Sequence, residues 1–514
     1  MTKYKVNNVK IIKNTILLYT RMVFLMLISL YTSRQILAEL GVDDYGIYNV
    51  VSGFIVMLSF VNGAISSSTS RYITFALGKN DRDWLGKVFS TCFQSHVAIS
   101  LVILIIAESF GLWMVTKILV IPENRMYAAI WVYQCSIIST ILMIWSVPYN
   151  ACIIAHEKMS AFAYISVFEG VAKLIIVFAL DWTKSDRLIL YAVLLLAVQI
   201  LISSLYWTYS LRNFEEAKPK LIFEKELFKE TLMFTGWNLW GGLAVAMYTQ
   251  GLNILLNVFF GPLVNAARGV AVTVQSTVSN FSSNFQTALN PQITKCYASG
   301  NLLEMYKLVF RSSKFAFLLM LCIVLPIICN TDFIMNLWLK EVPTYTPAFV
   351  RIMLIICLID SMANPIMTAI NANGNIKYYQ IIVGAIQLSI IVFAYIALLC
   401  GGNPISVFVI QLLVFILAFY VRLRIAEKLT GLSISGYLNK VVFRCCLIAF
   451  IAFAIGLTTC KLLPDSLTFN IISLSFSFIA TLCISYTGGL NANEKLFINE
   501  KIRIVYNRIS KSNI

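Results

Sequence analysis

The sequence predicts an all-α polytopic membrane protein with about 14 transmembrane helices. Of its 514 residues, 59% are apolar and only 12% are charged, and the mean hydropathy is +0.80, far outside the range of soluble domains. Apolar runs of about 18 to 25 residues recur along the whole chain, each long enough to cross a bilayer. The connections between these runs are too short to hold an enzyme domain, so a non-enzymatic membrane protein is expected.

The helices are placed on the apolar runs in chain order. They are expected at 14–38, 47–76, 88–115, 126–154, 162–181, 188–210, 232–259, 265–290, 308–329, 347–370, 378–399, 405–425, 441–462 and 468–486. Between the sixth and seventh helices lies a charged segment with alternating signs, typical of a linker. The predicted organisation is an N-lobe at 1–211, a cytoplasmic linker at 212–231, a C-lobe at 232–425, two further helices at 426–486 and a cytoplasmic tail at 487–514.

The basic residues indicate topology. A net charge of +16 would suggest a nucleic-acid partner in a soluble protein, but most of the 40 Lys and Arg lie between the spans. An even number of helices places both termini on one side, and the excess of Lys and Arg makes that side cytoplasmic. No nucleic-acid partner is therefore expected.

The two lobes are pseudo-symmetric. The end of the fourth helix, Pro148 to Ala155 (PYNACIIA), resembles the end of the tenth, Pro365 to Ala372 (PIMTAINA). Six helices separate the copies, so both copies have the same orientation in the membrane. Parallel repeats of this kind build transporters that bind substrate between two lobes.

Cofactor and metal chemistry is not predicted. The 12 cysteines lie mostly inside apolar spans without a Cys-x-x-Cys spacing, and there are only 2 histidines. The cysteines are interpreted as small apolar residues rather than as metal ligands or disulfides.

The expected helix at 265–290 carries a polar seam along its whole length. Its members lie within about 40° of one line on a helical projection: Arg268, Gln275, Ser279, Ser282, Gln286 and Asn290. Hydrocarbon cannot satisfy such groups, so the seam must face protein or a water-filled cavity. Buried packing with hydrogen bonds to neighbouring helices is the alternative.

Two other helices contribute polar sides, and the repeat makes the second helix equivalent to the eighth. The candidate cavity-lining residues of all three helices are Asn62, Ser66, Asn238, Gln250, Asn253, Gln275, Ser279 and Gln286. Amides and aromatic rings suit sugars, which stack on rings and hydrogen-bond to amides. They equally suit ordinary helix packing.

Charged residues inside the expected spans are mostly basic. Arg21, Arg71 and Arg268 have few acidic counterparts, which indicates an anionic cargo. Because arginine's planar fork can hold two phosphate oxygens, a diphosphate is the natural ligand. Arg21 also shares a helix side with Ile28 and Thr32, which favours a cavity.

The acids have alternative roles. Glu169 and Lys173 are spaced i,i+4 and are interpreted as a self-contained structural pair. Asp360 has no partner at helical spacing, so it is expected to pair with an arginine of another helix. Coupling to protons or sodium through Asp360 is the alternative.

Together with these features, the segment Leu40 to Tyr48 (LGVDDYGIY) resembles the polysaccharide-flippase branch of the multidrug/oligosaccharidyl-lipid/polysaccharide exporter superfamily, closest to O-antigen-unit flippases. The resemblance covers nearly the whole chain. It implies translocation of an undecaprenyl-diphosphate-linked oligosaccharide, of O-antigen, capsule or similar type, from the cytoplasmic to the periplasmic leaflet. The implied location is the bacterial inner membrane, and the implied mechanism is alternating access through a cationic cavity.

The resemblance assigns the diphosphate to Arg21, Arg71 and Arg268, because relatives carry cavity arginines on the same helices. The implied partners are the lipid-linked oligosaccharide, membrane lipids and surface-glycan polymerase machinery. Two alternatives stay open. A cation or drug antiporter of the same superfamily usually relies on intramembrane acids, which are scarce here. An integral-membrane glycan polymerase or ligase would need a catalytic group on a sizeable external loop.

Overall fold

The structure is a computed structural model that consists almost entirely of helices. It describes residues 8–57, 59–117, 121–181, 186–218, 224–339, 342–462, 464, 466–491 and 494–495. Most of the expected cytoplasmic tail lies outside these ranges.

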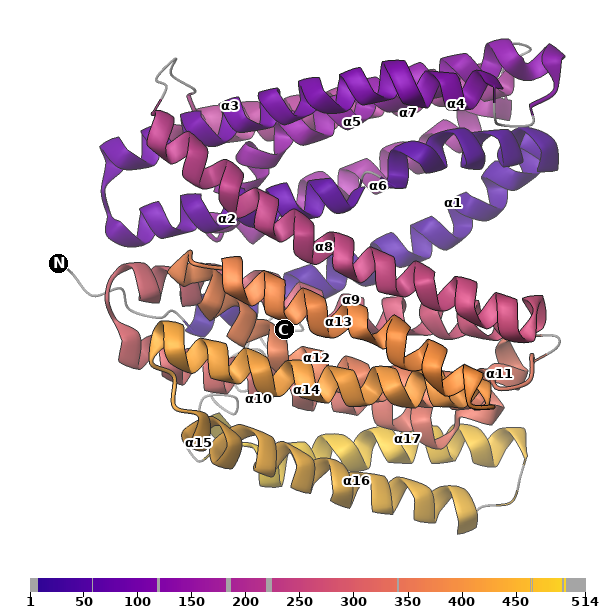
Figure 1. Ribbon diagram of the computed structural model, residues 1–514, viewed down its shortest axis with the longest axis vertical. Coiled ribbons are helices and arrows are strands. Elements are labelled where there is room, and N and C mark those ends of the chain that lie inside the picture. The colour runs from indigo at the N-terminus through magenta and orange to yellow at the C-terminus, as the bar shows by residue number, and fades with distance from the viewer. Residues whose placement is uncertain are drawn as a thin grey trace, which may run out of the picture. The chain divides into compact units, whose positions relative to one another are not determined.

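The helices follow one another along the chain without intervening strands in the described ranges (Figure 1). Their bounds are α1 Asn8–Met57, α2 Ser59–Lys79, α3 Arg82–Ile106, α4 Leu112–Lys117, α5 Met126–Ala155, α6 Met159–Asp181, α7 Arg187–Asn213, α8 Lys225–Phe260, α9 Pro262–Ala298, α10 Leu302–Cys329, α11 Thr331–Trp338, α12 Thr346–Asn373, α13 Lys377–Leu399, α14 Pro404–Thr430, α15 Ile434–Tyr437, α16 Phe443–Leu462 and α17 Leu467–Ile484. Short π-helical or 3-10 turns connect several of them.

Within the described residues, 11 helical segments are long and apolar enough to cross a membrane. All of them coincide with expected spans. The three expected spans outside this set are α1, α2 and α9, which carry the polar and basic residues singled out above. Polar side chains lower the hydropathy of α9 without shortening it. The membrane class is confirmed, while the count of fourteen and the cytoplasmic termini stay predictions.

The first helix is longer than expected. The sequence predicts a connection between residues 38 and 47, but α1 continues through it to Met57. The connecting segment contains no proline, and a glycine such as Gly41 weakens a helix without breaking it. Helix is described without a break from Asn8 to Met57, so the expected connection is itself helical.

The described chain forms two compact units, which do not follow the sequence repeat. The first unit comprises Met1–Ala246, Asn284–Met305 and Thr368–Ala385, and the second comprises Met247–Ser283, Tyr306–Met367 and Ile386–Ile514. Parts of α8, α9, α12 and α13 therefore belong to each unit. The division into an N-lobe and a C-lobe at the expected boundaries stays a prediction.

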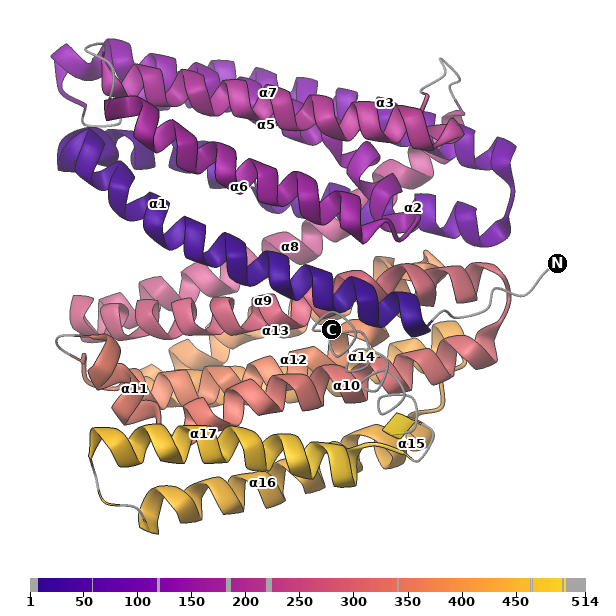
Figure 2. The same ribbon diagram turned by 180° about the vertical axis from the view of Figure 1, so that it is seen from behind.

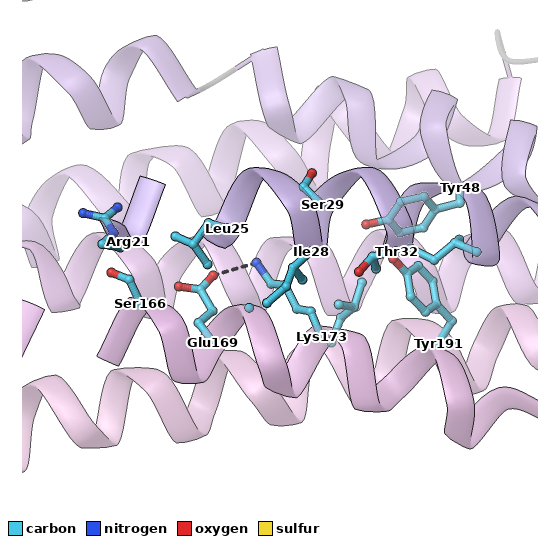
Figure 3. Close-up of a pocket in the computed structure, with 13 residues that line it drawn as sticks. Arg21, Leu25, Ile28, Ser29, Thr32, Tyr48, Ser166, Glu169, Lys173 and Tyr191 are labelled. Atoms are coloured by element: carbon cyan, nitrogen blue, oxygen red, sulfur yellow. Dashed lines mark hydrogen bonds and ion pairs between the residues drawn. The ribbon is translucent and has the colours of Figure 1, made fainter. Parts of the chain in front are cut away.

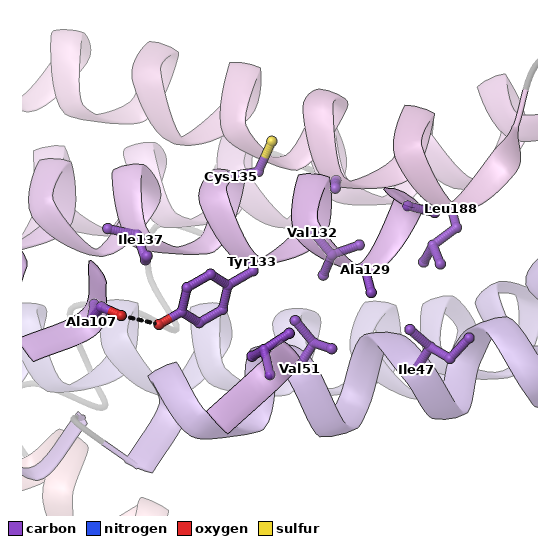
Figure 4. Packing of buried hydrophobic residues seen from close by; sticks show 12 residues of the cluster. Ile47, Val51, Ala107, Ala129, Val132, Tyr133, Cys135, Ile137 and Leu188 are labelled. Atoms are coloured by element: carbon purple, nitrogen blue, oxygen red, sulfur yellow. Dashed lines mark hydrogen bonds between the residues drawn. The ribbon is translucent and has the colours of Figure 1, made fainter. Parts of the chain in front are cut away.

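In the first unit, α5 packs against α7, α2 and α3, and α1 runs alongside α6 (Figure 2). Ala129 of α5 lies in the same apolar cluster as Val51 of α1 (Figure 4). Within this apolar cluster the Tyr133 hydroxyl donates a hydrogen bond to the Ala107 carbonyl at 2.7 Å. The phenol is thereby satisfied although it is fully buried.

Arg125 ties three parts of the first unit together. Its guanidinium donates to the Asp44 carboxylate of α1, with 2.8 Å from Nε to Oδ1, and to Asp186 at 2.6 Å. Asp186 also caps α7 by accepting from the Leu188 amide at 3.0 Å. Asp44 of the LGVDDYGIY segment thus has a structural role.

A buried carboxylate joins α9 to the turn between α5 and α6. Glu157 has a positive φ of 59°, and its side chain binds Lys295 at 2.8 Å and Gln292 at 3.3 Å. Its backbone carbonyl accepts from the Asn14 amide at 3.4 Å. We call Glu157, Lys295 and Gln292 the Glu157 joint. The joint holds segments far apart in the sequence within the first unit.

Arg71 of α2 holds the end of α12 in the same unit. Its Nε donates to the Asn371 carbonyl at 3.0 Å and its Nη2 donates to the Ala372 carbonyl at 3.4 Å. These carbonyls belong to the last turn of α12, beyond the regular helical hydrogen bonds, and the Asn371 carbonyl also accepts from the Gly374 amide at 3.1 Å. The following Gly374 has a φ of 91°, and a Cβ there would lie 2.2 Å from Arg71 Nη2. The glycine therefore makes room for the arginine.

In the second unit, α16 and α17 lie side by side (Figure 1). The preceding α14 has clear helix signals at both ends. The Asn403 side chain accepts from the Ser406 amide at 3.1 Å, Pro404 opens the helix, and Gly431 ends it with a φ of 77°. Lys314 of α10 also pairs with Glu494 at 2.6 Å.

Candidate functional site

A cavity of about 380 Å³ lies in the first unit between α1, α6 and α7. This volume falls in the usual range for small-molecule sites. Its polar and charged lining residues are Arg21, Ser29, Thr32, Tyr48, Ser166, Glu169, Lys173 and Tyr191 (Figure 3). We call this cavity the α1–α6 pocket.

Helical periodicity explains which residues reach the pocket. On α6, Ser166, Glu169, Gly170 and Lys173 recur at three- and four-residue spacings and so share one face. Gly170 allows the two helices to approach, because a Cβ there would lie 2.5 Å from Leu25 Cδ2. The distance between α1 and α6 thus depends on a residue without a side chain.

Arg21 occupies one end of the pocket. Its guanidinium lies 4.3 Å from the centre of the Phe162 ring, a cation–π distance. Its Nε is buried and has no hydrogen-bond partner in the described part of the structure. No carboxylate lies within ion-pair distance of Arg21 among the described residues. Of the residues that share a helix side with Arg21, Ile28 and Thr32 also line the pocket, whereas Phe24 and Gln35 do not.

Lys173 and Glu169 form the expected i,i+4 ion pair at 2.6 Å. The sequence interpretation treated the pair as purely structural. In the structure both side chains line the pocket, where they remain partly exposed (Figure 3). Together with Arg21 they leave one net positive charge in the pocket.

Tyr48 and Tyr191 occupy the opposite end. Their rings meet edge to face, with centroids 5.1 Å apart. Next to them the Thr32 hydroxyl is buried and lacks a hydrogen-bond partner among the described residues. This end therefore offers aromatic surface and an unused hydroxyl, whereas the Arg21 end offers charge.

A second, larger cavity of about 910 Å³ lies beside the turn between α2 and α3. Its charges largely compensate one another: His156 bonds Glu216 at 2.5 Å, and Lys87 bonds Glu224 at 2.7 Å. Burial opposes ionisation of Glu216, but the hydrogen bond from His156 and the nearby positive charge outweigh it and lower the pKa of Glu216. We take the α1–α6 pocket as the candidate site because it retains uncompensated positive charge.

Arg268 lies in the second unit, separate from the α1–α6 pocket. Its Nη1 donates to Asn253 Oδ1 at 2.6 Å, and its Nη2 donates to the Thr249 carbonyl at 2.8 Å. Asn253 in turn donates to Gln250 at 3.3 Å. The structure brings these three predicted residues together. The partners of Arg268 are neutral oxygens, so its charge is not cancelled by an ion pair in the described structure.

Asp360 is paired across helices, as expected. Its carboxylate lies 3.4 Å from Nη1 of Arg422 on α14. Nearby, the Ser279 hydroxyl contacts the Cys357 thiol at 3.4 Å, and that thiol reaches the Gln275 carbonyl at 3.9 Å. These contacts connect the α9 seam to α12 by hydrogen bonds, as the packing alternative predicts.

The remaining predicted lining residues belong to the first unit and have separate surroundings. The Asn62 amide lies 4.0 Å from the Met143 sulfur, and Asn238 accepts from Gln380 at 2.9 Å. Gln286 is buried, and Ser66 is half-buried. Their assignment to a glycan path stays a prediction.

Sequence reasoning missed the binding potential of Lys173, Tyr48 and Tyr191. Tyr48 lies in the LGVDDYGIY segment, which carries the family resemblance but has no predicted chemical role. The first helix is expected from the sequence to end at residue 38, whereas α1 extends to Met57 and includes Tyr48. Extending the expected helix would have placed Tyr48 near the pocket. Among the described residues, no cluster of His, Cys, Asp or Glu could hold a metal ion.

Comparison with known proteins shows the fold. No protein-family model and no curated protein sequence matches this chain. A multidrug resistance MATE family transporter of the MOP superfamily, solved in an outward-facing conformation, matches with a TM-score of 0.71 and 14% identity over 82% of this chain and 96% of that one. A second match is a MOP superfamily transporter from Pyrococcus furiosus, with a TM-score of 0.69 and 13% identity over 83% of this chain and 99% of that one. Its description states that the reverse polarity of its binding pocket suggests a different function.

The chain therefore has the two-lobed fold of MATE-like transporters of the MOP superfamily. At this level of identity the similarity defines the fold and leaves the substrate open.

Proposed function

We propose that the chain is a flippase that moves an undecaprenyl-diphosphate-linked oligosaccharide from the cytoplasmic to the periplasmic leaflet of a bacterial inner membrane. The observation that carries this proposal is Arg21, a cation in a cavity with no carboxylate at ion-pair distance among the described residues. A charge kept at such a site without a counter-ion is suited to an anionic ligand.

The charge balance of the buried residues supports an anion. The acids Glu169 and Asp360 are each already paired with a cation. Arg21 and Arg268 have no such partner within the described ranges, and Arg268 is bonded by neutral oxygens. A diphosphate would supply the missing negative charges, and its oxygens would accept charge-assisted hydrogen bonds.

The fold supports the transport part of the proposal. The similar solved structures are transporters, and one of them is described by a pocket of reverse polarity. Because only the head group needs an aqueous path, the lipid tail can remain in the bilayer during alternating access. The proposed partners are the lipid-linked substrate, surrounding lipids and surface-glycan polymerase machinery, and no catalytic step is assigned to the chain.

A cation or drug antiporter is the second candidate, because a similar structure is described as a multidrug resistance transporter. It would use Glu169, the acid that lines the α1–α6 pocket. In the present geometry, however, Lys173 neutralises this carboxylate at 2.6 Å. The two candidates differ in the sign of the ligand's charge.

Binding measurements on the purified protein test the proposal. We expect geranyl-diphospho-N-acetylglucosamine to bind and the cation ethidium not to compete with it. Arg21→Ala is expected to weaken binding about tenfold to a hundredfold, because charge-assisted hydrogen bonds contribute about 1.5–3 kcal/mol. Arg21→Lys is expected to retain part of the affinity, since lysine keeps the charge but loses the planar fork.

Arg187 provides the matched control. It pairs with Glu39 at 3.3 Å outside the α1–α6 pocket, so Arg187→Ala is expected to change affinity less than about twofold. Equal losses in the Arg21 and Arg187 variants would indicate a nonspecific charge effect. Tight ethidium binding without diphosphate binding would favour the antiporter.

A further inference from the structure

The Glu169–Lys173 pair gives the α1–α6 pocket an internal anion. Lys173 points into the cavity and is held by Glu169 at 2.6 Å (Figure 3). The side chains are 46% and 32% exposed, so the pair is reachable from the cavity. An ion pair that is only partly buried contributes little net free energy, so it can be exchanged for another partner.

We infer that Glu169 is a specificity-determining residue that competes with the ligand's phosphates for Lys173. In the empty pocket Glu169 neutralises Lys173 and leaves Arg21 as the uncompensated cation. When a diphosphate binds, one phosphate engages Arg21 and the other takes Lys173 from Glu169. This inference rests on the proposed function and assigns a head-group selectivity to the same site.

Charge counting explains the selectivity. A diphosphate diester carries two negative charges near neutral pH, whereas a phosphodiester carries one. A single charge is already balanced by Arg21 and gains little by displacing Glu169. A double charge gains a second pairing with Lys173, which offsets the lost Glu169 contact. Arg21 and Lys173 together therefore favour diphosphate-linked over monophosphate-linked lipids, and Glu169 sets the size of this preference by competing for Lys173.

The geometry places the sugar at the far end of the same pocket. Along the pocket the Glu169–Lys173 pair separates Arg21 from Tyr48, Tyr191 and Thr32 (Figure 3). Sugar rings stack on aromatic faces, and the Thr32 hydroxyl is buried without a partner in the described structure. A sugar attached to the phosphate at Lys173 would therefore reach the two tyrosine rings and the Thr32 hydroxyl.

The test compares two probes that differ by one phosphate: geranyl-diphospho-N-acetylglucosamine and geranyl-phospho-N-acetylglucosamine. Dissociation constants are measured by calorimetry on the full-length protein in detergent. We expect the native protein to prefer the diphosphate by at least about tenfold, because the second phosphate adds a charge-assisted pairing. Glu169→Gln is expected to tighten binding of both probes and to increase this preference by about tenfold, because the second phosphate no longer competes with a carboxylate for Lys173.

Two further variants make the result specific. Lys173→Gln is expected to weaken diphosphate binding about tenfold, and adding Glu169→Gln to it should change the preference less than Glu169→Gln does alone. Glu224→Gln removes the acid of a similarly exposed pair, Lys87–Glu224, outside the α1–α6 pocket and serves as the matched control. Thermal unfolding of each variant checks that the fold is retained.

The outcomes separate the two proposals. An unchanged preference in Glu169→Gln, with diphosphate binding that still depends on Arg21, would overturn the role of Glu169 and leave the proposed function standing. Absence of diphosphate binding by the native protein would overturn both. A change of equal size in Glu224→Gln would assign the effect to overall charge and also overturn the inference.

Discussion

Replacing Lys295 by methionine is expected to lower the free energy of unfolding by about 3–5 kcal/mol. The Glu157 side chain is only 1% exposed, so the substitution removes an ammonium group 2.8 Å from a buried carboxylate. Gln292 can still donate one neutral hydrogen bond at 3.3 Å, which does not replace the charge. Thermal unfolding of the purified protein in detergent measures the loss.

The double variant Glu157→Gln/Lys295→Met separates charge burial from packing. It removes both charges, so it is expected to recover most of the stability lost in Lys295→Met. Arg351→Met is the matched control, because the Arg351–Asp332 pair is 39% and 66% exposed and should contribute less than about 1 kcal/mol. Equal losses for Lys295→Met and Arg351→Met would contradict the importance assigned to the Glu157 joint.

Replacing Arg71 by alanine is expected to destabilise the protein by about 2–4 kcal/mol. The variant loses two donors to the last carbonyls of α12, and also the guanidinium that lies 4.4 Å from the Tyr72 ring and 5.1 Å from the Phe234 ring. Arg71→Lys should show a smaller loss, because lysine can still donate to one of the carbonyls. Unfolding midpoints and probe affinity should be measured on the same samples.

This measurement also distinguishes the two roles of Arg71. If Arg71 is structural, its replacement lowers the unfolding midpoint but leaves the diphosphate affinity of the folded molecules almost unchanged. The opposite pattern, normal unfolding with lost diphosphate affinity, would support the sequence prediction that Arg71 binds the diphosphate.

The sequence predicted the membrane class and the apolar spans well, because apolar length is a direct consequence of bilayer thickness. It also singled out the polar seam of α9, where Arg268 and the amide side chains lower the hydropathy of the span. The sequence predicted that Asp360 pairs with an arginine of another helix, but not that this arginine is Arg422. An isolated intramembrane acid requires a cation but does not indicate which helix supplies it.

The long-range contacts could not be predicted. Arg71 binds carbonyls 300 residues away, and Lys295 meets Glu157 across 138 positions. Neither contact has a periodic signal, because each depends on how helix ends meet after folding. The same holds for Lys173: its i,i+4 partner was evident, whereas its position on a cavity depends on how α6 packs against α1.

The most direct test of the account is flipping of an undecaprenyl-diphosphate-linked oligosaccharide in proteoliposomes under an imposed membrane potential, comparing native protein with Arg268→Ala. The account predicts transport by the native protein, loss of transport in Arg268→Ala and partial retention in Arg268→Lys. Export of a cationic dye without movement of any diphosphate-linked glycan would contradict the account. Normal flipping by Arg268→Ala would remove this arginine from the proposed path.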